Sequence, residues 1–479
     1  MILLFSRVWG SRRLKGGPGV HRRSFPLLLL AAWWLASAPA AAETWSTFTS
    51  ENGVRFRVRL QSPRLIRKVP LVDGVRWDIQ VANRVRNTVV KPLARGPIKT
   101  VTIQQDGAYV RVVARWRFPY AITGSFHADH FDFFMPDVIT RHRTVPIADG
   151  VTFQRVMRWT QAGPFSIGVI RANLRTVGIR PQIARSNRGF GLTTVSSLAR
   201  QAGAIAAVNG TFFTPGRGDP VGLIVQDGQV VHSSFLNRSV FGVRYDGSCF
   251  VDNARLKAAI RLSNGHLFAV TAVNRPPVRD QTVLYTSHWA SRTGSIPDPS
   301  RREVVVAADG TIEAVNTGNS FIPVDGYVIS AQGKALQEML RQVRIGQRAT
   351  VFAQLSDVWL GVQCAVGGGP TLVQRGKVLV TAREERFQAD IARGRAPRTA
   401  IGYVGDTGIV LVTVDGRQAT SVGMTLYELA RFMRELGAVE AINLDGGGST
   451  AMVVRGKLVN RPSDGFERPV SNALVLVPS

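Results

Sequence analysis

The hydrophobic and polar positions near the start of the chain alternate as they do in half-buried β-strands. Residues 54–60 read VRFRVRL, which places four apolar side chains on one face and three arginines on the other. Similar runs follow at 77–82, 98–104 and 110–118, with Gly, Pro and Asp-Gly turns between them. Since no amphipathic helix pattern interrupts these runs, we predict a small all-β module over residues 43–150.

After residue 150 the pattern changes to helices that alternate with strands. Thr425 and Glu428 match the S/T-x-x-E capping box, and an apolar helix face follows, made of Leu426, Leu429, Ala430, Met433 and Leu436. The segment LARQAGAIAAVNG at 198–210 repeats the plan of FMRELGAVEAINLDG at 432–446, namely helix, Gly-Ala, strand and Gly-rich turn. These patterns predict an α+β chain, in which the all-β domain is followed by an α/β domain, residues 151–479, with a mixed sheet and hairpins.

Three Gly-rich stretches each lead into a segment that reads as strand, turn and strand. The hairpin segments are 222–231, 371–380 and 451–460, and the stretches before them contain VNG, GGGP and DGGGST. Plain turn chemistry would explain one such stretch. Three with the same continuation indicate loops that gather at one end of a central sheet and form one concave site.

The residues of these loops suit chemistry on a sugar–phosphate bond. Asp445 follows the predicted strand 439–444, and the N–H groups of the glycines after it can form an anion-binding nest. A carboxylate there can act as base or nucleophile toward an anomeric carbon, and the nest can hold the departing phosphate. Because phosphate is a good leaving group, one carboxylate suffices where other glycosidases need two. Arg398, just before the predicted strand 401–404, offers a guanidinium fork for phosphate.

Composition and charge limit the classes of molecule that the protein is expected to bind. The chain is 45% hydrophobic, which excludes a disordered protein, and Lys+Arg 60 against Asp+Glu 32 gives a net charge of +28. That charge favours an anionic partner such as a phosphorylated glycan or a cell-surface polymer. Nucleic acid is not expected, because no helix-turn-helix, zinc-finger or RNP-type motif occurs.

The first residues predict export. Residues 1–24 hold six basic residues and no acid, the apolar run FPLLLLAAWWLA covers 25–36, and Ala40, Ala41 and Ala42 form a small-residue cleavage site. We interpret residues 1–42 as a signal peptide, with an uncleaved anchor as the alternative, and place the protein in the periplasm or outside the cell. Arg22 and Arg23 also resemble a weak twin-arginine signal. No stable membrane span is expected.

Two further features leave alternatives open. The cysteines, Cys249 and Cys364, are read as a disulfide or as two buried thiols, and no pair has zinc-ligand spacing. The segment Asp129-His130-Phe131-Asp132 is interpreted as a polar strand edge rather than a metal site, because no further ligand is placed by spacing. Asp219, Asp406 and Asp445 could converge on a divalent ion, but no cofactor is required.

The motifs together resemble the phosphodiester glycosidase family. They are VNGTFF with GDPVGLIVQDGQVV, GGGPTLVQRGKVLV, APRTAIGY, and INLDGGGSTAMVVRGKLVNRPSD followed by ERPVSNALVLV, in the family's order over about residues 150–479. The resemblance implies hydrolysis of an α-linked sugar from a phosphodiester, with Asp445, Arg398 and Asn209 as catalytic residues. It also implies substrate contacts at Gly210, Asp219, Thr399, Asn443, Gly446, Gly447, Gly448 and Ser449. Thr211 departs from the Asn-Gly-Gly-Phe-Phe that members often carry, which puts the accepted sugar in doubt.

Residues 43–150 lie outside that resemblance. Their short strands, with RVVARWRF late in the run, faintly resemble AMIN-type modules, exported β-domains implicated in cell-wall attachment. The alternative function is therefore a non-catalytic protein that binds a cell-wall polymer or polysaccharide through this module.

Overall fold

The computed structural model describes most of the chain after residue 44. The described residues are 45–50, 53–90, 98–116, 122–136, 138–160, 162–175, 179–186, 189–254, 256–276, 278–405 and 407–478. The predicted signal peptide, residues 1–42, lies outside them. Within the described residues no helix is long and apolar enough to cross a membrane.

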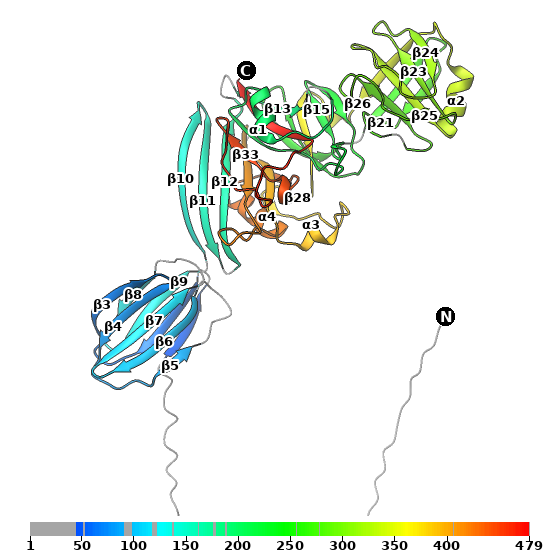
Figure 1. Cartoon of the computed structure of the whole chain (residues 1–479). Coiled ribbons are helices and arrows are strands. Elements are labelled where there is room, and N and C mark those ends of the chain that lie inside the picture. Colours follow the sequence, from blue (N-terminus) through cyan, green and yellow to red (C-terminus); the bar gives the residue numbers. More distant parts are fainter. Residues whose placement is uncertain are drawn as a thin grey trace, which may run out of the picture. The chain divides into compact units, whose positions relative to one another are not determined.

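The α+β prediction, with an α/β catalytic domain and a mixed sheet, is wrong. Among the described residues the chain forms thirty-five strands and four α-helices (Figure 1). Every strand pairing there is antiparallel except the short pair β21–β22, Ala272–Val273 with Thr282–Thr286. The described part of the molecule is therefore mostly β. Its few helices cover sheet faces and do not connect parallel strands.

Residues 45–136 form a two-sheet sandwich. One sheet has the order β1 (Trp45–Ser50), β2 (Gly53–Arg59), β9 (His130–Pro136), β8 (Thr123–Phe126), and the other β3 (Arg64–Leu71), β4 (Gly74–Gln80), β7 (Tyr109–Trp116), β6 (Ile98–Asp106), β5 (Thr88–Val90). Phe56, Trp77 and Phe133 stack in its core. The alternation predicted for 54–60 is confirmed, since the three arginines of β2 face away from this core.

Three sheets share the next core. The eight-stranded sheet has the order β10 (Ile139–Ala148), β11 (Val151–Thr160), β12 (Gly163–Asn173), β31 (Gly408–Val414), β30 (Arg398–Val404), β32 (Glu440–Asn443), β28 (Thr371–Gln374), β29 (Lys377–Val378). The second has β13 (Ile179–Arg185), β35 (Asn472–Pro478), β14 (Ala206–Asn209), β33 (Met452–Val454), β34 (Lys457–Leu458). The third has β16 (Gln229–His232), β15 (Ile224–Gln226), β27 (Val362–Gly367), β17 (Ser239–Arg244), β18 (Cys249–Asn253).

Both faces of the central strands of the first two of these sheets are buried, whereas β10 at the edge of the first sheet is mostly exposed. On β31, Leu411 points into the core shared with the second sheet, while Val410 and Val412 point to the opposite face. That opposite face is covered by helix α4 (Leu426–Glu435), and α1 (Val195–Gln201) covers the outer face of the second sheet. The sheets therefore form a double layer with a helix on each outer side.

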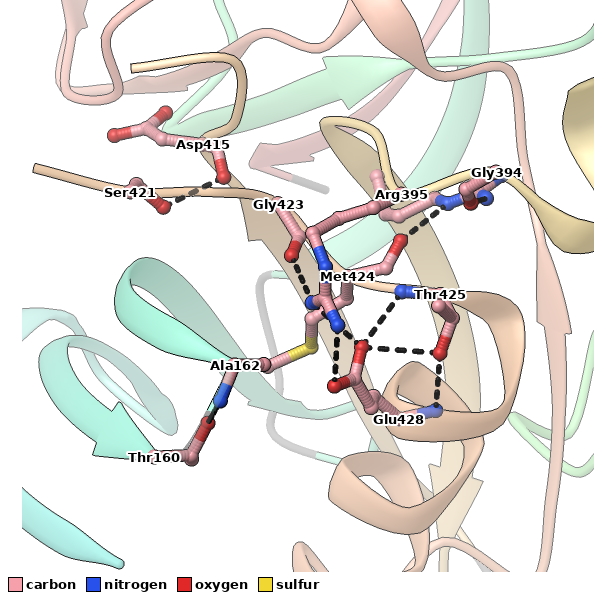
Figure 2. A network of polar contacts seen from close by, with 11 residues as sticks. Thr160, Ala162, Gly394, Arg395, Asp415, Ser421, Gly423, Met424, Thr425 and Glu428 are labelled. Carbon is pink, nitrogen blue, oxygen red and sulfur yellow. Dashed lines mark hydrogen bonds and ion pairs between the residues drawn. The ribbon is translucent and has the colours of Figure 1, made fainter. Parts of the chain in front are cut away.

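The two predicted helices are confirmed with their caps. Thr194 caps α1, and the capping box of α4 is present in both directions between Thr425 and Glu428. Figure 2 shows that Glu428 also accepts from Arg395, with Arg395 Nη1 to Glu428 Oε2 at 2.7 Å. Arg395 in turn donates to the carbonyl of Gly423 at 2.7 Å. The start of α4 is thus fastened to the chain that leads into β30.

Residues 257–354 form a further body between β18 and β27. Its sheets have the orders β20 (Leu267–Val270), β19 (Lys257–Leu262), β26 (Ala349–Gln354) and β21, β22, β25 (Tyr327–Gln332), β23 (Arg301–Val306), β24 (Ile312–Asn316). Helix α2 (Lys334–Gln342) packs on β25, and α3 (Ala389–Arg393) lies later in the chain beside α4. The sequence pattern did not separate this body from the rest of 151–479.

The two cysteines are free thiols. Cys249 on β18 and Cys364 on β27 are both register partners of Val243, on opposite sides of β17. Two strand spacings, about 10 Å, therefore separate them, which is beyond the reach of a disulfide. Burial raises the pKa of the Cys364 thiol to about 12.

Candidate functional site

The first and third Gly-rich loops meet directly, and the second lies against Asn443, just before the third. The first loop follows β14 at Asn209, the second joins β27 to β28 through Gly367–Pro370, and the third joins β32 to β33 through Asp445–Thr450. Asn209 Nδ2 donates to the Asp445 carbonyl at 2.6 Å, and Asn443 Nδ2 donates to the Gly369 carbonyl at 3.0 Å. The loops come from three sheets, not from one end of a central sheet.

Asn209 joins the strands beneath the site. Its Oδ1 accepts from Thr399 Oγ1 at 2.7 Å and from the Ala451 N–H at 3.2 Å. Three residues here are at most 1% exposed, namely Asn209, Thr399 and Asn443. The side chains of Asn209 and Thr399 bond to each other and to the loops, whereas Asn443 Oδ1 is buried with no hydrogen-bond partner among the described residues.

Thr211 has a structural partner that the sequence did not reveal. Asn472, at the start of β35, donates from Nδ2 to Thr211 Oγ1 at 2.9 Å and accepts from the Thr211 N–H at 3.1 Å. Gly210 packs so closely on this asparagine that a Cβ would lie 2.0 Å from Asn472 Oδ1. The hydroxyl of Thr211 is therefore used inside the protein.

Asp445 is the acidic group of the third loop. Its side chain is partly exposed, and its Oδ1 accepts from the Gly446 N–H at 2.9 Å. Burial raises the pKa of Asp445 to about 6, against the opposing effects of the Ser449 hydroxyl, the Gly446 N–H and the charge of Arg468. A carboxylate whose pKa lies near neutrality and that reaches solvent can serve as a base or nucleophile.

Two arginines that sequence reasoning missed lie against the glycines of this loop. A Cβ on Gly447 would lie 3.5 Å from Arg417 Nη2, and one on Gly448 would lie 2.2 Å from Arg468 Nη2. Arg468 also pairs with Asp464, Nη2 to Oδ2 at 2.6 Å. A side chain at Gly448 would thus displace the Arg468–Asp464 pair, whereas Gly447, at a φ of 59°, leaves room beside Arg417. The signal was present in the ERPVSNA segment, but it gave no reason to choose one arginine among many.

Arg398 lies close by, but most of its hydrogen-bonding capacity is used by the protein. Nε donates to the Met424 carbonyl at 3.0 Å, and Nη2 donates to the carbonyls of Ile391 at 3.0 Å and Gly394 at 2.6 Å. Burial lowers the pKa of Arg398 to about 10, and the charge of Arg417 acts in the same direction. Only Nη1 has no hydrogen-bond partner among the described residues, so a bidentate grip on phosphate is not available in this arrangement.

The second loop is braced by a buried acid. Glu385 accepts from the N–H groups of Ser239 and Thr371, both at 2.9 Å. A Cβ on Gly369 would lie 2.2 Å from Glu385 Oε2. This carboxylate, which sequence reasoning missed, has a structural setting because its oxygens are taken by backbone and hydroxyl donors.

Asp219 has an ion-pair partner of its own. Its carboxylate pairs with Arg217 at 2.9 Å, and burial raises its pKa. No hydrogen bond or ion pair joins it to Asp445 within the described ranges, and Asp406 lies outside them. The proposed convergence of three aspartates on a metal ion therefore has no support in the described part of the chain.

Residues 300–477 match the family model of phosphodiester glycosidases. The chain is 44% identical over 80 residues, 17% of its length and 12% of the relative's, to the uncharacterized prophage-derived protein YomE of Bacillus subtilis (strain 168). It is 28% identical over 173 residues, 33% of each chain, to mouse N-acetylglucosamine-1-phosphodiester alpha-N-acetylglucosaminidase. The matches therefore span about an eighth to a third of the length of these curated relatives.

Two solved structures share the fold more widely. A hypothetical protein from Synechocystis aligns with a TM-score of 0.63 at 22% identity, covering 91% of this chain and 80% of the other. A protein named "putative exported protein", from Burkholderia pseudomallei K96243, aligns with a TM-score of 0.57 at 23% identity, covering 91% and 100%. The region that contains Asp445 and its glycine loop, within residues 300–477, therefore matches the phosphodiester glycosidase family.

Proposed function

We propose that the protein is an exported hydrolase that cleaves an α-glycosyl phosphodiester in a phosphorylated glycan or exopolysaccharide. The observation that carries the proposal is Asp445, a partly exposed carboxylate with a raised pKa at the meeting of the first and third loops, with Arg417 and Arg468 against its glycines. A single carboxylate beside guanidinium groups fits a substrate that carries its own good leaving group.

The proposed reaction uses this charge arrangement directly. The Asp445 carboxylate attacks the anomeric carbon or removes a proton from a water that does so. The bond from that carbon to the phosphate oxygen breaks, and the electron pair leaves with the phosphomonoester. Arg417 and Arg468 offset the charge that develops on this phosphate, and water completes the release of free sugar.

Export and an anionic partner belong to the same proposal. The basic stretch before residue 25, the apolar run 25–36 and the small residues 40–42 support export, and the Burkholderia protein with this fold is named as an exported protein. The net charge of +28 supports an anionic glycan or cell-wall polymer as partner, with the sandwich as a second contact surface.

The direct test is an assay on the purified mature chain. We expect incubation with a panel of α-sugar-1-phosphodiesters to release reducing sugar and a phosphomonoester from at least one of them. Matched sugar-1-phosphates and alkyl α-glycosides, which lack the phosphodiester, serve as controls. Salt-sensitive binding to a cell-wall polymer without release of sugar from any panel member would favour the non-catalytic alternative instead.

The raised pKa of Asp445 predicts an acid limb in the pH profile. Because the working form is the carboxylate, we expect kcat/KM to fall about tenfold per pH unit below pH 6, where Asp445 becomes protonated. The measurement is kcat/KM from pH 4 to 9 at constant ionic strength. A rate that instead rises below pH 6 would mean that Asp445 acts as an acid, contrary to the proposed role.

A further inference from the structure

The turn between β8 and β9 in the N-terminal sandwich gathers three groups that ligate metals. One ring nitrogen each of His127 and His130 and one carboxylate oxygen of Asp132 all lie within 4.8 Å of one another. His130 and Asp132 are two residues apart on β9 and therefore share one face of the sheet. Phe131 and Phe133 point the other way, into the core of the sandwich. His127 stands on the other side of the tight turn, with its ring stacked on His130 at 4.2 Å between centroids.

The hydrogen bonding of His130 prepares one nitrogen for a ligand. Its Nδ1 is bonded to Asp129 Oδ1, so the proton of a neutral ring would sit on Nδ1 and its lone pair on Nε2. Nε2 is buried, has no hydrogen-bond partner within the described ranges, and lies 3.5 Å from Asp132 Oδ2. Two acceptors at that distance repel each other unless a cation lies between them. A carboxylate that orients a ligating histidine through its other nitrogen is a recurrent arrangement in zinc sites.

Two arginines and two carboxylates surround the site: Arg57 and Arg55, whose Nη1 lies 3.9 Å from Asp132 Oδ2, face Asp132 and Asp129, so the protein charges balance before an ion binds. Arg57 binds the Asp132 carboxylate with both Nε and Nη2 at 2.9 Å, and this contact fixes its orientation. Each carboxylate oxygen has a second lone pair, so Oδ2 can face a metal while it accepts from Arg57. Asp129 adds a further negative charge at the turn, which offsets that of Arg57.

We propose that His127, His130 and Asp132 form a binding site for a divalent transition-metal ion of the zinc class, and that Asp129 positions His130. Two imidazoles and one carboxylate suit Zn²⁺, Co²⁺ or Ni²⁺ far better than Ca²⁺ or Mg²⁺, which prefer oxygen ligands. Three protein ligands leave one position of a tetrahedral ion for water. The ion would fasten the two ends of the β8–β9 turn, and it is separate from the hydrolytic reaction proposed for Asp445.

The competing interpretation is that His130 is an imidazolium held between Asp129 and Asp132 without a metal. The two interpretations differ in a measurable way. An imidazolium offers no lone pair and requires nothing of His127, whereas a metal site depends on both histidines.

The test is Zn²⁺ titration of the mature full-length chain by calorimetry, after chelator dialysis and removal of any purification tag. We expect one ion per chain, a Zn²⁺-dependent rise in melting temperature, and visible absorption bands when Co²⁺ replaces Zn²⁺. His127→Ala, an exposed position, should weaken binding at least 100-fold, and Asp129→Asn by about 10–100-fold.

The matched control is His266→Ala. His266 pairs with Glu338, Nε2 to Oε1 at 3.0 Å, but no third ligand joins this pair in the described residues. This variant should bind Zn²⁺ like the unmodified chain. Absence of binding to the unmodified chain, or equal binding by His127→Ala, would overturn the proposal. Because none of these outcomes depends on sugar release, the metal site and the hydrolytic function fail or stand separately.

Discussion

Asp445→Asn is expected to lower kcat/KM for an α-glycosyl phosphodiester by about 10³–10⁴-fold while the chain remains folded. The amide keeps the size of the side chain and its contact with the Gly446 N–H, but it cannot act as base or nucleophile. Because burial already disfavours the charge on Asp445, removing that charge should leave stability unchanged or slightly higher. Released reducing sugar and the melting temperature are the two measurements.

The matched control for this substitution is Asp227→Asn. Asp227 is exposed in the turn between β15 and β16 at a φ of 49°, a conformation that asparagine also tolerates. The same chemical change there should leave kcat/KM within about twofold. Turnover by Asp445→Asn at the rate of the unmodified chain would remove Asp445 from the mechanism.

Arg398→Met is expected to destabilise the domain by about 3 kcal/mol, whatever it does to activity. The substitution leaves the carbonyls of Ile391 and Gly394 without this donor, whereas the Met424 carbonyl keeps the Ala396 N–H, and each carbonyl left unpaired away from water costs about 1–3 kcal/mol. Relief of the desolvation that lowers the Arg398 pKa offsets part of this cost. The measurement is the melting temperature by calorimetry, with KM and kcat determined at a temperature where the variant is folded.

The control here is Arg383→Met. Arg383 is exposed, and no side-chain bond to it is seen in the described residues. If the melting temperature of Arg398→Met is unchanged and its KM is raised, Arg398 binds the substrate and does not stabilise the loops. If the melting temperature is lowered while KM and kcat change little, Arg398 is a structural residue at the edge of the site.

The local elements were predictable because each depends on neighbouring residues. The predicted capping box of α4 is formed by side chains three positions apart and is confirmed, and the helix predicted before Gly203 is confirmed as α1. The three hairpins predicted at 222–231, 371–380 and 451–460 are confirmed as β15–β16, β28–β29 and β33–β34. Strand β2 shows the predicted alternation because one face of its sheet meets the core and the other does not.

The fold class was wrong for a physical reason that β31 shows. Its run IVLVTV is apolar at nearly every position, as in the buried parallel strands of α/β proteins. Here the strand is antiparallel to β12 and β30, and it is apolar throughout because one face meets the second sheet and the other meets α4. Burial on both faces is visible in a sequence, but strand direction is not.

The residues of the candidate site also fall into those that the sequence pattern indicates and those that only the tertiary structure reveals. The sequence by itself singled out Asp445 and its glycines as candidates, because a carboxylate at a strand end before three glycines is a local pattern with a chemical meaning, and the family resemblance added Asn209. Only the tertiary structure decided which arginines face that loop, that Arg398 is occupied by carbonyls, and that Asp219 is paired with Arg217. Contacts between residues far apart in the chain depend on how the sheets pack together, and composition and spacing carry no record of that packing.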